Sequence, residues 1–345
     1  MNIHGGYYGD NNVVDYSVNI NPLGLSSHIR QAIIDSIDEI DKYPEIKGTT
    51  TRNAIAEYLH IDYNKIIMGN GASELIYLYA RAIKPKKVLI IEPTFNEYRR
   101  AFELVGSDIY DYMLDSNNDF IFNVDEFATM INKVNPDVVV LCNPNNPTGK
   151  LIDEKELLDI IEIIRNNNSF LFIDESFIEF SDRESIIYKS DYDNILSLRS
   201  MTKYYAIPGI RIGYAVSNNK VINKMEEYKE PWTMNTFALN IVPKIIQDIE
   251  FHHKISKWIT TERDYMYSQL SKINNITVYK SYTNFFLCKL KYFSGNMLNL
   301  QLLEKNMYIR VCENFQSLDD RFIRIAIKKH EDNEKLINVL KNIID

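Results

Sequence analysis

The sequence has few cysteines and no long apolar segment, and both absences exclude whole classes of protein. Its three cysteines, Cys142, Cys288 and Cys312, lie far apart without CxxC spacing, which argues against a disulfide framework and a zinc site. No apolar run approaches the roughly 20 residues of a membrane helix. The start of the chain lacks the basic and apolar regions of a signal peptide. We therefore expect a cytoplasmic protein that binds no membrane.

An excess of basic residues is also missing. The chain has 39 Lys and Arg against 47 Asp and Glu, which gives a formal charge of -8, so a general affinity for nucleic acid or anionic lipid is not expected. His252 and His253 are adjacent, but no cysteine or carboxylate cluster accompanies them at ligand spacing. We therefore expect no nucleic-acid partner and no metal site.

What is present is the composition of an ordinary globular protein. Hydrophobic residues make up 45% of the 345 residues and charged residues 25%, which excludes disordered, collagen-like and disulfide-scaffold classes. At about 150 residues per domain, the length suits two domains.

Short apolar runs alternate with amphipathic stretches up to about residue 220. The runs are VLIIEP, VVVLCNP, FLFIDES, ILSLRS and RIGYAVS, and their lack of polar alternation predicts strands that are buried on both faces. The stretches between them, such as residues 154–166, have helical spacing of apolar residues. This alternation predicts an α/β domain with a mainly parallel sheet.

The pattern differs at both ends of the chain. The first thirty residues are rich in Gly, Asn and Pro, which predicts an irregular arm. Beyond residue 221, two long helices (236–248 and 251–272) precede two strand-like segments, ITVYKSYTNFFLCKL and FIRIAIKK, and a final helix. We predict an arm over 1–30 that contributes to the small domain and the active site, a large domain over 31–225, and a small α+β domain over 226–345.

Polar residues follow the predicted strands, at the sheet edge where ligands bind in open α/β folds. Asn146 lies in NPNNPTG, Asp174 ends FLFID, and Lys203 follows ILSLRS. Taken singly, these residues also suit a tight turn, a helix N-cap and a solvated surface lysine. A lysine in a desolvated pocket, however, has a lowered pKa and can form a Schiff base with a carbonyl group.

Two further groups of residues suggest a phosphate site. Gly69, Gly71, Ala72 and Ser73 precede the apolar helical stretch LIYLYARAI, and small residues let backbone amides at a helix N-terminus approach a phosphate. The hydroxyls and guanidinium near Lys203 favour the same ligand; they belong to Ser200, Thr202 and Arg211.

Together these groups are the parts that hold pyridoxal 5'-phosphate. The segments GNGASE, PTF, NPNNPTG, IDESF, SMTKYYAIPGIRIGY and FIRIAI resemble those of fold-type I pyridoxal-phosphate enzymes of the class I and II aminotransferase group. The resemblance covers nearly the whole chain. It implies an α/β fold with a mainly parallel seven-stranded sheet in the large domain and a smaller α+β domain.

The resemblance also implies a role for each residue. Lys203 would be the catalytic residue and bond the cofactor aldehyde, Asp174 would pair with the ring nitrogen, and Asn146 would contact the ring oxygen and the substrate. The cofactor would further be held by Ala72, Ser73, Phe95, Ser200, Thr202, Arg211 and, from the second subunit of a homodimer with shared active sites, Tyr43. The substrate would be bound by His4, Gly5, Gly6, Asn19, Arg310 and Arg324, the last on its α-carboxylate.

Two aromatic residues, Phe177 and Trp232, bear on the predicted pocket. Many members of the group have a tyrosine where this chain has Phe177, so the ring oxygen would depend on Asn146 and on the imine that Lys203 forms. Trp232 lies at the predicted domain junction, and we expect it to pack in the core rather than line the pocket.

Within the group, the segments HGG, DYSVNINPLG and IRVCENFQSLDDRFIRIAIK look like those of the threonine-phosphate decarboxylases of cobalamin synthesis. This implies decarboxylation of L-threonine O-3-phosphate to (R)-1-aminopropan-2-yl phosphate. Two alternatives stay open: a histidinol-phosphate aminotransferase that uses 2-oxoglutarate, and a decarboxylase or aminotransferase of another phosphorylated or phosphonate amino acid.

Overall fold

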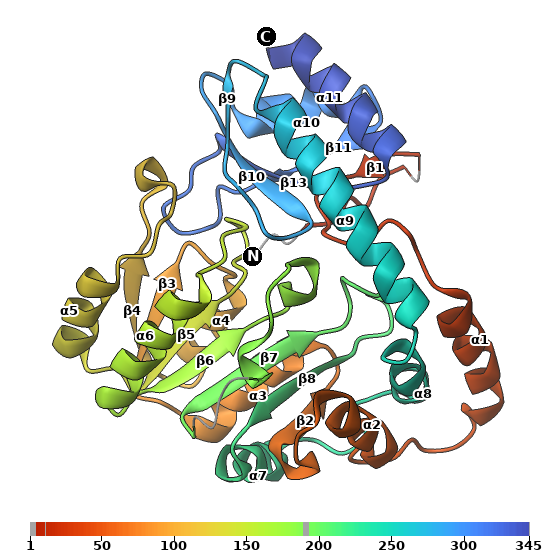
Figure 1. The fold of residues 1–345 in the computed structure, drawn as a ribbon, viewed down its shortest axis with the longest axis vertical. Helices are drawn as coiled ribbons and strands as arrows, with labels where there is room; N and C mark the ends of the chain where they lie inside the picture. The colour runs from red at the N-terminus through yellow and green to blue at the C-terminus, as the bar shows by residue number, and fades with distance from the viewer. Residues whose placement is uncertain (1–4, 11, 189–192, 345) are drawn as a thin grey trace.

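The larger part of the molecule is built on a seven-stranded sheet. A computed structural model describes residues 5–10, 12–188 and 193–344, and Figure 1 shows the sheet with helices on both faces. The strand order is β2-β8-β7-β6-β5-β3-β4. Only β8 runs antiparallel to its neighbours, so the predicted mainly parallel sheet is confirmed. The strands are β2 (Ile66–Gly69), β3 (Lys87–Glu92), β4 (Asp108–Met113), β5 (Val138–Cys142), β6 (Phe170–Asp174), β7 (Ile195–Ser200) and β8 (Gly213–Ser217).

Both faces of this sheet are buried, which explains the uninterrupted apolar runs. Along β3, Val88 and Ile90 pack into one hydrophobic cluster and Leu89 and Ile91 into the other. One face is covered by α3 (Ala72–Ile83), α4 (Glu97–Glu103) and α7 (Asn219–Tyr228), and the other by α5 (Val124–Val134) and α6 (Glu154–Asn166). The apolar runs did not reveal β2, which is short, or β4, which is a partly exposed edge strand.

The carboxyl ends of β5, β6 and β7 lie at the same edge of the sheet. Cys142 is the register partner of Asp174, and Asp174 is the partner of Leu198. Because parallel strands end together, the segments that follow β5 and β7 lie next to the end of β6. This juxtaposition assembles the site described below.

The C-terminal part contains an antiparallel sheet in the order β12-β13-β10-β9. Its strands are β9 (Ile276–Val278), β10 (Phe285–Leu290), β12 (Arg310–Val311) and β13 (Phe322–Ala326), and its helices are α9 (Ile249–Leu270), α10 (Gly295–Leu303) and α11 (His330–Ile344). In Figure 1, α9 runs from the region of α8 to the antiparallel sheet. These strands lie within residues 226–345, and those of the large sheet within 31–225.

The N-terminal arm is fastened to the C-terminal part. Its strand β1 (Val14–Asp15) pairs with β11 (Met307–Tyr308), and the Tyr16 amide donates to the Tyr308 carbonyl at 2.7 Å. The chain continues through α1 (Ser27–Asp35) and α2 (Thr49–Leu59), which pack on α8 (Thr236–Ile245). The short 3-10 helices are η1 (Ser36–Glu39), η2 (Tyr63–Lys65), η3 (Ser116–Asn118), η4 (Ile178–Phe180) and η5 (Ile186–Tyr188). Among all described residues, no helix combines the length and apolarity needed to cross a membrane.

Candidate active site

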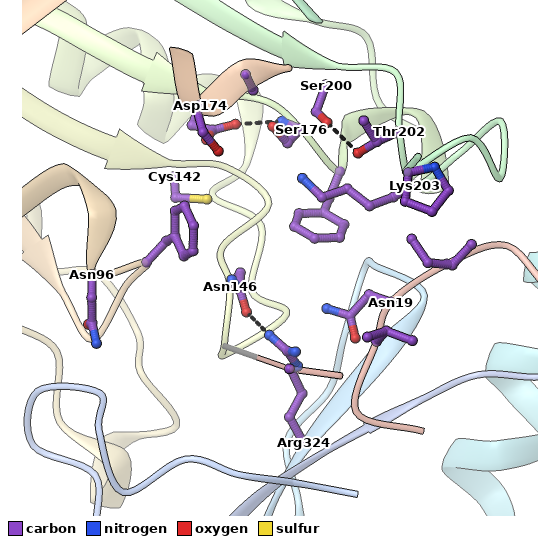
Figure 2. Close-up of a pocket in the computed structure, with 18 of the residues that line it drawn as sticks. Asn19, Asn96, Cys142, Asn146, Asp174, Ser176, Ser200, Thr202, Lys203 and Arg324 are labelled. Carbon is purple, nitrogen blue, oxygen red and sulfur yellow. Dashed lines mark hydrogen bonds between the residues drawn. The ribbon is translucent and has the colours of Figure 1, made fainter. Parts of the chain in front are cut away.

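A cavity of about 350 Å³ lies beyond the carboxyl ends of the central strands, between the two sheets. Figure 2 shows side chains from both parts of the molecule pointing into it. Of the residues predicted from the sequence, those lining it are Gly5, Asn19, Ala72, Ser73, Phe95, Asn146, Asp174, Ser200, Thr202, Lys203, Arg211, Arg310 and Arg324. Residues up to 319 positions apart therefore meet here, as between Gly5 and Arg324.

Lys203 enters the cavity from the loop after β7. Its Nζ lies 4.9 Å from the centre of the Phe177 ring. Burial lowers the pKa of Lys203, while the charge of Asp174 acts in the opposite direction. The sign of the net shift favours a neutral amine, which is the nucleophilic form. The arm supports this loop, because the Asn21 amide donates to the Lys203 carbonyl at 3.1 Å.

Asp174 ends β6 at the base of the cavity, and each of its carboxylate oxygens accepts a hydrogen bond. Oδ1 accepts from the Ser176 amide at 2.8 Å, and Oδ2 accepts from the Tyr98 hydroxyl at 2.6 Å. Its cost of burial is thereby offset, since buried carboxylates need donors. It faces the same cavity as Lys203.

A cradle for an anion forms where α3 begins. Gly71 precedes the helix with φ 80° and ψ 161°, a conformation that is almost confined to glycine. A Cβ atom on Gly71 would stand 2.9 Å from Cζ of Arg211. The Ser200 and Thr202 hydroxyls lie 2.9 Å apart on the same side of the cavity. Helix amides, two hydroxyls and a guanidinium make a site for a phosphate.

On the opposite wall, β13 contributes a buried guanidinium. Arg324 donates to the Asn146 side-chain oxygen and, at 2.8 Å, to the Ser17 carbonyl. Among the described residues, its Nε has no hydrogen-bond partner. Burial lowers the pKa of Arg324 to about 10, which leaves it protonated at neutral pH. A buried cation held by neutral acceptors is suited to bind an anionic substrate group.

The arm and β12 complete the wall. Arg310 donates to the Asn314 side-chain oxygen at 2.5 Å. The side-chain oxygen of Asn19 is buried without a hydrogen-bond partner in the described part of the chain. Gly6 does not line the cavity, and its amide donates to the Ser17 hydroxyl at 2.8 Å. His4 lies outside the described residues.

Tyr43 and Trp232 lie outside the cavity. Tyr43 is 84% exposed, and its ring centre is 5.1 Å from that of Trp232. The expectation that Trp232 packs in the core is wrong: its side chain is 46% exposed. The reason is local, since Trp232 follows Pro231 with φ 56° in a loop that turns it onto Tyr43.

Several residues that shape the cavity were not predicted from the sequence, namely Ser17, Asn96, Tyr98, Cys142, Ser176 and Asn314. Tyr98 could have been found, because it follows Phe95 by three residues and so shares its side of the turn into α4. Ser17 and Asn314 carry no such signal. They reach the cavity only because the arm and the loop after β12 fold over it.

The donor set fits pyridoxal 5'-phosphate. The cradle beside Gly71 suits its phosphate, Asp174 can meet its ring nitrogen, and the amine of Lys203 can meet its aldehyde. The buried hydroxyl of Ser176 and the side-chain oxygen of Asn19 have no partners among the described residues, so polar contacts remain to be made inside the cavity.

Known proteins agree with this assignment. The family model for class I and II aminotransferases matches residues 11–340. A provisionally named threonine-phosphate decarboxylase of Caldanaerobacter subterraneus subsp. tengcongensis is 39% identical, over 99% of this chain and 94% of its own. A histidinol-phosphate aminotransferase of Methanosphaera stadtmanae is 32% identical, over 97% and 92% of the two chains.

Solved structures show the same pair of enzymes. The histidinol-phosphate aminotransferase of Clostridium acetobutylicum superposes with a TM-score of 0.89 and 33% identity, covering 95% of this chain and 98% of the other. The L-threonine-O-3-phosphate decarboxylase of Porphyromonas gingivalis gives 0.85 and 27% over the same shares. The chain therefore belongs to the class I and II aminotransferase family, whose enzymes depend on pyridoxal 5'-phosphate.

Proposed function

We propose that this enzyme decarboxylates L-threonine O-3-phosphate to (R)-1-aminopropan-2-yl phosphate and carbon dioxide, as a step of cobalamin biosynthesis. The observation that carries the proposal is the pair of buried guanidinium groups, Arg310 and Arg324, on one wall of the cavity. A substrate with both a phosphate and a carboxylate supplies one anion for each. The 39% identity to the Caldanaerobacter protein supports the same substrate.

The chain's own residues have distinct tasks in this reaction. When bound, the cofactor provides an electron sink that stabilises negative charge on the substrate Cα. Arg324 holds the α-carboxylate and thereby fixes the direction of the bond that breaks. Arg310 holds the substrate phosphate, so that binding energy remote from Cα is used for orientation. Lys203 takes up the proton that the substrate ammonium group loses, and it then returns a proton to Cα.

Transamination is the second candidate. It is supported by the histidinol-phosphate aminotransferases among the relatives, one at 32% identity and one superposing with a TM-score of 0.89. The same cavity would then orient a Cα–H bond instead of the carboxylate, and Lys203 would remove that proton as a general base.

We further propose that two copies share their active sites. An open groove beside the cradle contains Asn70, which adjoins Gly71, together with Tyr43 and Trp232. Exposed apolar side chains continue from this groove along α1, η1 and the following loop: Ile34, Ile37, Ile40 and Ile46. A second copy that covers this surface would bring Tyr43 to its partner's cofactor phosphate and remove the apolar patch from water.

The two reactions are separated by their products. Purified enzyme with pyridoxal 5'-phosphate is incubated with L-threonine O-3-phosphate and no keto acid, and carbon dioxide release is followed. Histidinol phosphate with 2-oxoglutarate is tested in parallel by glutamate formation. We expect catalytic carbon dioxide release that is lost in Lys203→Ala. Glutamate formation without carbon dioxide release would refute the decarboxylase proposal.

A further inference from the structure

The hydroxyl group of Tyr98 lies next to the site, but none of the tasks in cofactor or substrate binding described above is assigned to it. Tyr98 is in α4 and is only 1% exposed. Its hydroxyl donates to Oδ2 of Asp174 at 2.6 Å, while Oδ1 accepts from the Ser176 amide at 2.8 Å. The two oxygens are therefore held by donors from different segments, one from α4 and one from the turn after β6.

The Tyr98 hydroxyl keeps its proton, and so remains a donor, at neutral pH. Burial and the nearby charge of Asp174 raise the pKa of Tyr98 well above its ordinary value. Burial also raises the pKa of the neighbouring Cys142 thiol to about 12, so that group is neutral too. Tyr98 consequently orients the carboxylate without adding a charge that would compete for it.

The Tyr98 ring is itself held from two directions. It meets the Phe95 ring edge to face, with centres 5.7 Å apart at 84°, and the Phe172 ring with centres 6.1 Å apart at 60°. Phe172 belongs to the buried sheet, and Phe95 lines the cavity. Packing of this kind fixes the ring, and hence the position of the hydroxyl.

We propose that Tyr98 is a positioning residue that holds the Asp174 carboxylate in the orientation in which it meets the ring nitrogen of the cofactor. The terminal torsion of an aspartate is broad, so one donor alone leaves the carboxylate free to turn. The inference rests on the proposed placement of the ring nitrogen at Asp174, and it holds for decarboxylation and transamination alike.

The test is the isosteric change Tyr98→Phe in the full-length protein. Cofactor-free protein is titrated with pyridoxal 5'-phosphate, which gives the dissociation constant. The reloaded enzyme is then titrated with pH, which gives the midpoint at which the absorbance of the bound cofactor changes. Loss of one hydrogen bond to a charged group should weaken cofactor binding roughly tenfold. The midpoint should move by about half a pH unit or more. The reason is that the hydrogen bonds which the Asp174 carboxylate accepts change its pKa, and with it the strength of its pairing with the ring nitrogen.

Tyr79→Phe is the matched control. Tyr79 belongs to the same hydrophobic cluster and is fully buried, with its ring against Phe172. Within the described residues its hydroxyl has no hydrogen-bond partner. Tyr79→Phe therefore removes an equally buried hydroxyl away from Asp174, and both measured quantities should stay at the wild-type values. Thermal melting of both variants tests whether they are folded.

Asp174→Asn separates the two ways in which the proposal can fail. If Asp174→Asn changes both quantities and Tyr98→Phe behaves like Tyr79→Phe, the positioning role is refuted. If Asp174→Asn changes neither quantity, the ring nitrogen does not lie at Asp174 and the role falls with that placement. The decarboxylase proposal is independent of both results, because carbon dioxide release decides it.

Discussion

Gly71→Ala tests the anion cradle with a single methyl group. Gly71 has φ 80° and ψ 161° immediately before α3, a region that costs other residues about 1–3 kcal/mol. The new Cβ would stand 2.9 Å from Cζ of Arg211, with a terminal nitrogen nearer still. Arg211 would therefore have to turn away from the cradle.

The two effects appear in different measurements. Backbone strain acts on the protein without cofactor and should lower its melting temperature by a few degrees. Displacement of Arg211 acts on the phosphate and should remove a charge-assisted hydrogen bond of about 1.5–3 kcal/mol. That loss corresponds to a roughly 10- to 100-fold rise in the dissociation constant for pyridoxal 5'-phosphate, which equilibrium dialysis measures directly.

Gly106→Ala is the control for backbone strain. Gly106 has φ 82°, and no heavy atom lies within 4 Å of an added Cβ, so the variant carries strain without a clash. We expect a loss of stability with unchanged cofactor affinity. If Gly71→Ala also binds the cofactor as tightly as the wild type, the reasoning that places the phosphate beside Gly71 and Arg211 is refuted.

Three further predictions concern Arg324, the buried carboxyl group of Glu92 and the proposed sharing of active sites. Arg324→Lys, which keeps the charge but loses the planar fork, should lower kcat/KM for the phosphorylated substrate roughly 10- to 100-fold; an unchanged value would exclude Arg324 as the carboxylate ligand. Burial raises the pKa of Glu92 from 4.5 to about 7. Between these two pH values the folded state retains a proton that the unfolded state releases. The free energy of unfolding should therefore fall by roughly 3 kcal/mol as the pH rises from 4.5 to 7. Urea unfolding of Glu92→Gln at pH 5 and pH 8 should lack this decrease, and an undiminished decrease would contradict the assignment. Mixing inactive Tyr43→Ala and Lys203→Ala subunits should restore activity, because each mixed dimer has one intact site; no recovery, although mixed dimers form, would refute shared sites.

Most of the large sheet was predictable from local patterns. Five strands were visible as apolar runs because both faces of the sheet are buried, and α6 followed from its helical spacing. The edge strand β4 was not visible as such a run, because it is partly exposed and its residues are mostly polar or aromatic. The seven-stranded architecture came from the resemblance to a family.

The positions of Asn146, Asp174 and Lys203 could also be predicted from the sequence. Each ends or follows an apolar strand, and parallel strands end at one edge, so residues at the ends of neighbouring strands lie near one another. The chemistry of this group was therefore encoded locally. Trp232 was misassigned because its exposure depends on a loop conformation that no periodicity reports.

The sequence by itself thus determined five strands of the large sheet, the residues at the carboxyl ends of its central strands and the kind of cofactor that such residues hold. Only the tertiary structure decided the contacts around them. Tyr98 reaches Asp174 across 76 positions, and Arg324 reaches Asn146 across 178 and Ser17 across 307. Such pairs leave no periodic signal, because they depend on how separate layers pack and not on the repeat of one element.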